Sequence, residues 1–224
     1  MRLLFTACVL GALVALTGAS AGKAQGPECL GLPATISGAG TITGTNGDDV
    51  IVGSAGVDAI NALGGNDTVC GGQGSDTILG GTGDDTIAGD DGVGGPNTPG
   101  GDDLIDGQNG NDELFAEGGD DTILGGNGDD FGAGFNGDDT ISGGNGDDTF
   151  VGGPQNDVVN GDNGNDVLFG AFGDDTLNGG SGDDYLDGDL PNPPFVDPNP
   201  NSDNCNGDGG TDAAANCEAT TGVP

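Results

Sequence analysis

The sequence has no histidine and no tryptophan, and only two basic residues, Arg2 and Lys23. Without histidine the chain lacks the most common general base and the imidazole that zinc and copper prefer as a ligand. Lys23 lies in an N-terminal leader and the serines are scattered, so nucleophilic catalysis has little to use. We therefore expect no enzyme activity. Aromatic residues make up 4% of the chain, which argues against a conventional layered core.

The acidic residues, 38 in number, give the chain a formal net charge of −36. Nucleic acid and anionic membrane surfaces repel such a chain, so we expect no nucleic-acid partner. The apolar run from Leu3 to Leu16 is short for a bilayer span, and no later segment is longer, so we expect no membrane insertion. The partner that this charge favours is a cation.

The N-terminus has the form of a signal peptide over residues 1–21. Arg2 precedes the apolar run, and Ala19-Ser20-Ala21 resembles a cleavage site. We predict a secreted, extracellular protein, in which residues 22–43 form a leader and an N-terminal cap.

Cysteine usage agrees with export. Loss of Cys8 with the signal peptide would leave four cysteines, an even number that permits two disulfides outside the cell. Three pairings are open. We favour Cys29–Cys70 and Cys205–Cys217, one at each end of the chain, over four free thiols.

Glycine and aspartate, by contrast, are abundant and regularly spaced. A nine-residue unit, written GGNGDDTFV at residues 143–151, occurs sixteen times from Gly44 to Asp187 without a change of frame. Position four is glycine in fifteen units, position six is aspartate in fifteen and position eight is apolar in fourteen. Such a short fixed period is typical of a solenoid, and it argues against the disorder that the composition alone suggests.

The repeat is irregular in three places. The unit at residues 89–97 has Gly94 at position six and Pro96 at position eight, which predicts a looped-out or poorly bound turn. Gly132 leaves a weak core position. Residues 188–224 begin as a proline-rich excursion and end in a shortened unit, residues 207–215, which we interpret as a C-terminal cap closed by the second disulfide.

Each unit divides into a turn and a strand. The first six residues are glycine-rich and favour a tight turn, and the last three, such as Thr77–Leu79, form a minimal strand. Alternation directs position eight to one side of that strand. Stacked about 4.8 Å apart, such strands build two short-stranded sheets around a thin core. The expected fold is an all-β solenoid, capped at both ends.

This stacking also places the aspartates in columns, with Asp121, Asp139 and Asp157 along one edge. Two unit charges about 5 Å apart repel by roughly 3 kcal/mol at an effective dielectric of about 20. Summed over a column, the repulsion exceeds the stability of a typical domain, so cations must lie between the turns. Carboxylates and backbone carbonyls are hard oxygen ligands, which select calcium. Adjacent Asp-Asp pairs are interpreted as a ligand plus an outer-turn residue rather than as an acid–base pair.

The unit resembles the RTX, or haemolysin-type, calcium-binding repeat, whose consensus is G-G-x-G-x-D-x-U-x. The resemblance covers all sixteen units. It implies a right-handed parallel β-roll with eighteen residues per coil and calcium ions between the turns of successive coils. The family's position-six ligand falls on Asp49, Asp58, Asp67, Asp76, Asp85, Asp103, Asp112, Asp121, Asp130, Asp139, Asp148, Asp157, Asp166, Asp175 and Asp184. Asp212 is a weaker match, and Gly94 departs from the pattern.

We predict a secreted calcium-binding protein that folds on binding several calcium ions. A structural or adhesive role at or beyond the bacterial surface is expected, with a cell-surface or extracellular polymer as partner. The alternative is a calcium-dependent ice- or surface-binding module, because threonine recurs at position seven and asparagine at position three. A degenerate enzyme or toxin ranks last, because the length before Gly44 is too short for a catalytic domain.

Overall fold

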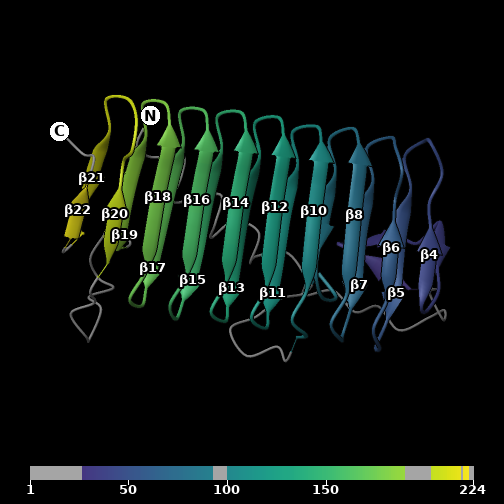
Figure 1. Ribbon diagram of the computed structural model, residues 1–224. Coiled ribbons are helices and arrows are strands. Elements are labelled where there is room, and N and C mark those ends of the chain that lie inside the picture. The colour runs from purple at the N-terminus through teal and green to yellow at the C-terminus, as the bar shows by residue number, and fades with distance from the viewer. Residues whose placement is uncertain (1–26, 93–99, 190–202, 218, 222–224) are drawn as a thin grey trace.

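The computed structural model describes residues 27–92, 100–189, 203–217 and 219–221. Within these ranges the chain is all-β and has two ten-stranded parallel sheets stacked as a solenoid, as expected (Figure 1). None of the described residues belongs to a helix that is long and apolar enough to cross a membrane. The predicted signal peptide, and residues 190–202 of the predicted excursion, lie outside the described residues.

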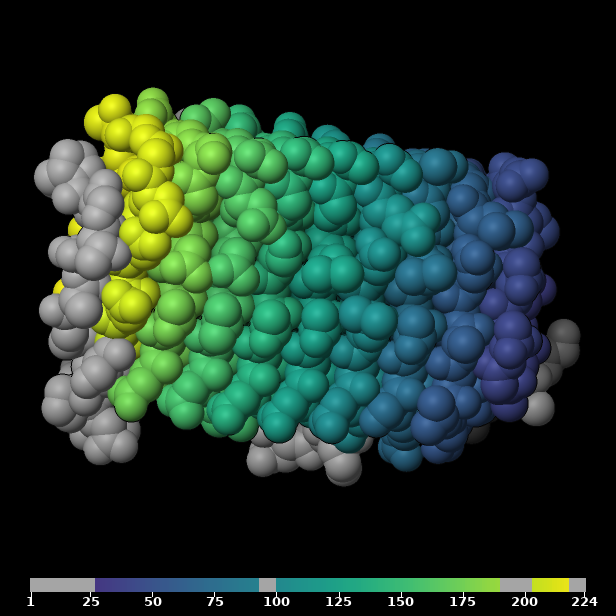
Figure 2. Space-filling view, viewed as in Figure 1, coloured from purple at the N-terminus to yellow at the C-terminus, as the bar shows by residue number. Residues whose placement is uncertain are grey.

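Consecutive strands alternate between the two sheets. The first sheet contains β4 (Thr41–Thr43), β6 (Ala59–Asn61), β8 (Thr77–Thr82), β10 (Leu104–Asn109), β12 (Thr122–Asn127), β14 (Thr140–Asn145), β16 (Val158–Asn163), β18 (Thr176–Ser181), β20 (Asn204–Asn206) and β22 (Ala219–Thr221). The second contains β3 (Ile36–Ser37), β5 (Val50–Ser54), β7 (Thr68–Gly72), β9 (Thr86–Ala88), β11 (Glu113–Gly118), β13 (Phe131–Asn136), β15 (Thr149–Pro154), β17 (Val167–Phe172), β19 (Tyr185–Asp189) and β21 (Ala213–Ala215). One coil therefore takes two repeats, and successive coils follow one another along the solenoid (Figure 2).

Most strands are longer than the three residues predicted from the unit. In β12 and β14 the pairing begins at Thr122 and Thr140, and it continues through Gly126 and Gly144. Sequence reasoning assigned these glycines to the turn. They have positive φ, 113° and 106°, so the backbone bends there without leaving the sheet.

The core is formed mainly by position-eight side chains from both sheets, with Ala62 and Ala116 from position one beside them. At the weak point, Gly132 is paired with Phe150 of the next coil, and a Cβ at residue 132 would lie 2.8 Å from the Phe150 ring. The large side chain on one coil thus fills the space left by the small residue on its neighbour. The core cluster contains Ile42, Ile51, Ile60, Val69, Ile78, Ile87, Ile105, Leu114, Ile123, Ile141, Phe150, Val159, Leu168, Leu177, Leu186 and Cys205.

The irregular unit at residues 89–97 adds length to one turn and leaves the stack intact. Ile78 of β8 pairs directly with Ile105 of β10, 27 residues later, where other coils repeat after 18. The turn that begins at Gly89 is completed by Asp103, whose Oδ2 would lie 2.4 Å from a Cβ on Gly89. Gly94 and Pro96 lie outside the described residues.

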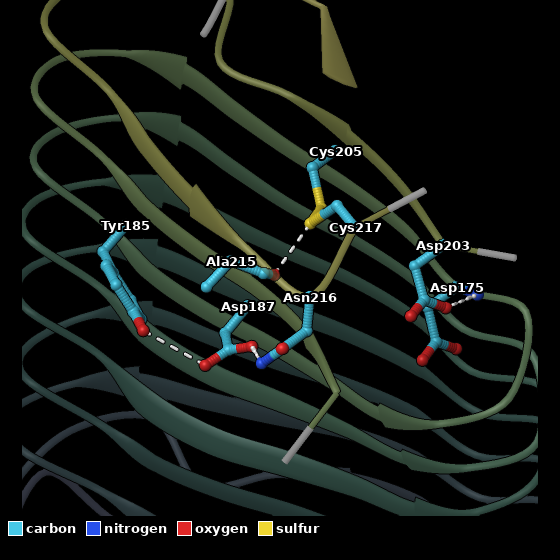
Figure 3. Close-up of a disulfide and its surroundings, with 8 residues drawn as sticks. All are labelled: Asp175, Tyr185, Asp187, Asp203, Cys205, Ala215, Asn216 and Cys217. Atoms are coloured by element: carbon cyan, nitrogen blue, oxygen red, sulfur yellow. Dashed lines mark hydrogen bonds between the residues drawn. A yellow bond between two sulfur atoms is a disulfide. The ribbon is translucent and has the colours of Figure 1, made fainter. Parts of the chain in front are cut away.

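Both favoured disulfides are present, one at each end of the solenoid. Cys29 ends β1 (Glu28–Cys29), which pairs antiparallel with β2 (Leu32–Pro33), and it bonds to Cys70 on β7. Cys205 bonds to Cys217 at the other end (Figure 3). Cys205 is fully buried opposite Leu177, so it occupies a core position as well.

We expect the substitution Phe150→Ala to destabilise the calcium-loaded protein by about 3–5 kcal/mol, because it opens a cavity beside Gly132 that the backbone cannot fill. Thermal unfolding in saturating calcium measures the loss. Phe135→Ala is the matched control, since Phe135 is 41% exposed. Equal losses in the two variants would contradict the assignment of position eight to the core.

Candidate metal centre

The position-six aspartates form two hydrogen-bonded columns, one along each edge of the solenoid. In each coil the Oδ1 atom accepts the backbone N–H of the equivalent aspartate in the preceding coil. Asp121 N donates to Asp139 Oδ1 at 2.9 Å, and Asp139 N donates to Asp157 Oδ1 at 2.8 Å. The first column is Asp49, Asp67, Asp85, Asp112, Asp130, Asp148, Asp166, Asp184 and Asp212; the second is Asp58, Asp76, Asp103, Asp121, Asp139, Asp157, Asp175 and Asp203.

All fifteen aspartates selected from the sequence lie in these columns, and so does Asp212. Asp203 was missed. It accepts the Asp175 N–H at 2.9 Å after a separation of 28 residues, and the close-up shows the two side by side (Figure 3). Counting nine residues back from Asp212 would have found it, because the frame resumes after the excursion with a shift of one residue.

The second carboxylate oxygen of most column aspartates is buried and has no hydrogen-bond partner. No column aspartate is more than 8% exposed. A buried oxygen without a partner is costly, so a column of them indicates a missing ligand. The Oδ2 atoms concerned belong to Asp67, Asp76, Asp85, Asp103, Asp112, Asp121, Asp130, Asp139, Asp148, Asp157, Asp166, Asp175, Asp184, Asp203 and Asp212.

The first two aspartates differ from the rest. Asp49 Oδ2 accepts hydrogen bonds from Thr45, through the backbone N–H at 2.7 Å and the hydroxyl at 2.9 Å. Asp58 Oδ2 accepts the Ser54 N–H at 2.6 Å. Both carboxylates are satisfied by their own turns, at the end of the solenoid where no earlier regular coil exists.

Backbone carbonyls converge on the unpaired oxygens. A Cβ placed on Gly125 would lie 2.5 Å from Asp130 Oδ2 and 2.5 Å from the carbonyl oxygen of Gly143, in the next coil. At Gly125 a side chain would fill the space that these oxygens share, which favours glycine at position one. The same arrangement recurs at Gly170, where a Cβ would lie 2.4 Å from Asp175 Oδ2 and 2.5 Å from the Gly188 carbonyl oxygen.

This donor set fits calcium. Calcium takes six to eight oxygen ligands and accepts backbone carbonyls and water beside carboxylates. Within the described ranges, no group of three or more histidine, cysteine or acidic side chains converges on one point. A metal held here must therefore take most of its ligands from the backbone, as the glycine-rich turns allow.

Burial raises the pKa of the column carboxyls from Asp67 to Asp184. It raises that of Asp103, Asp121 and Asp157 to about 8, and that of Asp130 and Asp148 to about 7. The backbone N–H on Oδ1 lowers these values, and neighbouring carboxylates of the same column raise them further. A divalent cation beside Oδ2 would instead favour the charged form.

Position five carries a separate, exposed ladder. Asp138 N donates to Asp120 Oδ1 at 3.0 Å, and Asn156 N donates to Asp138 Oδ1 at 3.0 Å. This ladder bonds to the preceding coil, whereas the position-six N–H bonds to the following coil. The two carboxylates of an Asp-Asp pair such as Asp138-Asp139 thus belong to different networks, one in solvent and one buried.

A parallel β-solenoid with columns of unpaired carboxylate and carbonyl oxygens defines a cation-binding repeat protein. The family model described as the RTX calcium-binding nonapeptide repeat matches residues 36–69, 71–93, 100–131, 133–168 and 160–190, well over half of the chain. The chain belongs to this family of calcium-binding β-roll proteins. No curated protein matches the chain.

The raised pKa values predict that acid partly replaces calcium. In chelator, the folded chain binds more protons than the unfolded chain, whose carboxyls titrate near 3.8. Stability of the metal-free fold is therefore fully present below about pH 4 and is lost as the pH rises through about 6 to 8. Circular dichroism in chelator should show more β-structure at about pH 5.5 than at about pH 8, where the metal-free chain is largely unfolded.

In saturating calcium this pH dependence should weaken or reverse, because protons then compete with the metal for Oδ2. A content of β-structure in chelator that rises with pH would contradict the burial of the column carboxyls.

Proposed function

We propose that the protein is secreted and that its β-roll folds when calcium binds between the stacked turns. The observation that carries the proposal is the double column of buried Oδ2 atoms without hydrogen-bond partners. The chain has almost no positive side chains that could neutralise these carboxylates, since Arg2 and Lys23 are its only basic residues. Calcium from outside the chain supplies the missing charge.

The ligands in this proposal are the position-six aspartates, each acting with carbonyl oxygens of the glycine-rich turns. The proposed set is the fifteen aspartates predicted from the sequence, with Asp203 and Asp212 added at the C-terminal end. Support is strongest where Oδ2 is unpaired, from Asp67 onwards. It is weakest at Asp49 and Asp58, whose Oδ2 atoms accept hydrogen bonds from their own turns.

Calcium is favoured over the other common divalent metals by the ligand chemistry. Magnesium demands near-octahedral geometry at shorter distances and dehydrates reluctantly, whereas these turns offer irregular oxygen ligands. Zinc prefers nitrogen and sulfur ligands, the chain has no histidine, and four of its cysteines form the disulfides.

Secretion rests on the signal-like pattern of residues 1–21 and is supported by the two disulfides, which persist in oxidising compartments. Extracellular calcium is abundant, so a chain that is expanded before export would fold on release. We place its role in structure or adhesion outside the cell, with a surface or extracellular polymer as partner.

An ice- or surface-binding role is the second proposal, and its main support is an asparagine ladder. Asn127 Nδ2 donates to Asn109 Oδ1 at 3.1 Å, and Asn145 Nδ2 donates to Asn127 Oδ1 at 2.9 Å. The threonine row beside it is broken, however, because Thr140 is followed by Val158 on the next coil. We therefore rank a structural or adhesive role first.

Removal of calcium should unfold the repeats. The far-ultraviolet circular dichroism spectrum should show β-structure in millimolar calcium and a largely disordered chain in chelator at neutral pH, because column repulsion is then unscreened by metal. Isothermal calcium titration under the same conditions should show uptake of several ions together with folding. If the spectrum in chelator at low ionic strength were identical to the spectrum in calcium, the proposal would be wrong.

A matched pair of substitutions separates ligands from other acidic residues. Asp139→Asn should weaken calcium binding at the affected turns by roughly tenfold or more, because it removes a buried anionic oxygen. Asp138→Asn removes the same charge from the exposed neighbour and retains its Oδ1 acceptor, so the calcium midpoint should change little. The folding midpoint in a calcium titration measures both. Equal shifts would mean that total charge, and not ligation, governs the response.

A further inference from the structure

Two acidic side chains are buried at position two of the repeat. This position is glycine in six of the sixteen units, and where it carries a large apolar side chain, as at Leu63 and Phe135, that side chain is 39% and 41% exposed. Asp90 and Glu117 occupy the same position, yet they are only 2% and 7% exposed. The nonapeptide consensus gives no role to a carboxylate here.

The two carboxylates are neighbours on successive coils. β9 pairs with β11, and Ala88 is the register partner of Phe115. Asp90 and Glu117 each follow this pair by two residues. The amide of Gly92 donates to Glu117 Oε2 at 3.3 Å, which holds that side chain over the turn of Asp90. Burial and, next, the Glu117 charge raise the pKa of Asp90 to about 7.

Asp90 has two unpaired oxygens, one more than any column aspartate. Neither Oδ1 nor Oδ2 has a hydrogen-bond partner among the described residues; the Gly118 backbone lies near enough to lower the pKa of Asp90 but not to satisfy the carboxylate. A Cβ placed on Gly100 would lie 2.1 Å from Asp90 Oδ2 and 1.7 Å from the Gly118 carbonyl oxygen. An anionic and a carbonyl oxygen therefore point at one space, beside the Glu117 carboxylate.

We propose that Asp90, Glu117 and the Gly118 carbonyl bind one further calcium ion, additional to those between the repeat turns. The proposal deepens the calcium-binding function and rests on it for the identity of the cation. Two carboxylates together with carbonyl oxygen and water form a suitable calcium donor set. The ion would link the long turn between Gly89 and Asp103 to the following coil, because Asp90 lies in that turn and Glu117 lies in the next coil.

Native mass spectrometry of the calcium-loaded protein counts bound ions directly. The double variant Asp90→Asn, Glu117→Gln should retain one calcium ion fewer than the wild-type protein at the same free calcium. Asp162→Asn is the matched control. Asp162 also occupies position two, but it is exposed and its Oδ2 accepts a hydrogen bond from the Ser142 hydroxyl, so the count should stay at the wild-type value.

Circular dichroism in saturating calcium checks that each variant folds. If the double variant does not fold, Asp90→Asn alone is measured, and it should lose the same single ion. An unchanged count in a folded variant overturns this site. Failure of the wild-type protein to bind any calcium would overturn the proposed function itself, so the two failures are distinguishable.

Discussion

The structure depends on burying like charges without any internal counter-charge. Each coil adds two carboxylates to columns in which one oxygen of each is satisfied by a backbone amide and the other, over most of the solenoid, by nothing in the chain. The hydrogen bonds set the register of the coils, and the unpaired oxygens leave the stack incomplete. Packing offsets little of this deficit, because each repeat contributes little more than one position-eight side chain to the apolar core. The fold is therefore tied to the metal to a degree that a domain with a thick core would not be.

Much of this could be predicted from the sequence because each position of the repeat has the same structural role in nearly every unit. The period and frame of the repeat predicted the solenoid, the apolar residues at position eight predicted the core, and the aspartates at position six predicted fifteen members of the columns. The two disulfides followed from the location of the cysteines at the ends of the array. These inferences succeeded because each coil contacts almost only its neighbours, so local pattern and tertiary structure coincide.

The remaining features depend on contacts between coils that a single unit does not encode. Strands extend through Gly126 and its equivalents because neighbouring backbones continue to pair there, which composition alone assigned to a turn. Phe150 compensates for Gly132 only because a coil brings them together. Asp203 was missed because the frame shifts by one residue within an irregular stretch. Asp90 and Glu117 were not distinguished from the surface acids, since burial of a position-two side chain is not visible in the pattern.

The two edges of the solenoid are not equivalent. In the column of Asp112 and Asp130 every regular turn runs from a position-one glycine to its aspartate without added residues, as from Gly207 to Asp212 at the C-terminal end. Both long segments, residues 93–99 and 190–202, are instead spliced into turns of the opposite column, between Gly89 and Asp103 and between Gly188 and Asp203. Insertion has been tolerated twice on one side and not on the other. The described solenoid thus has one edge whose turns all have the same length, and this difference between its edges gives the molecule a polarity across its width.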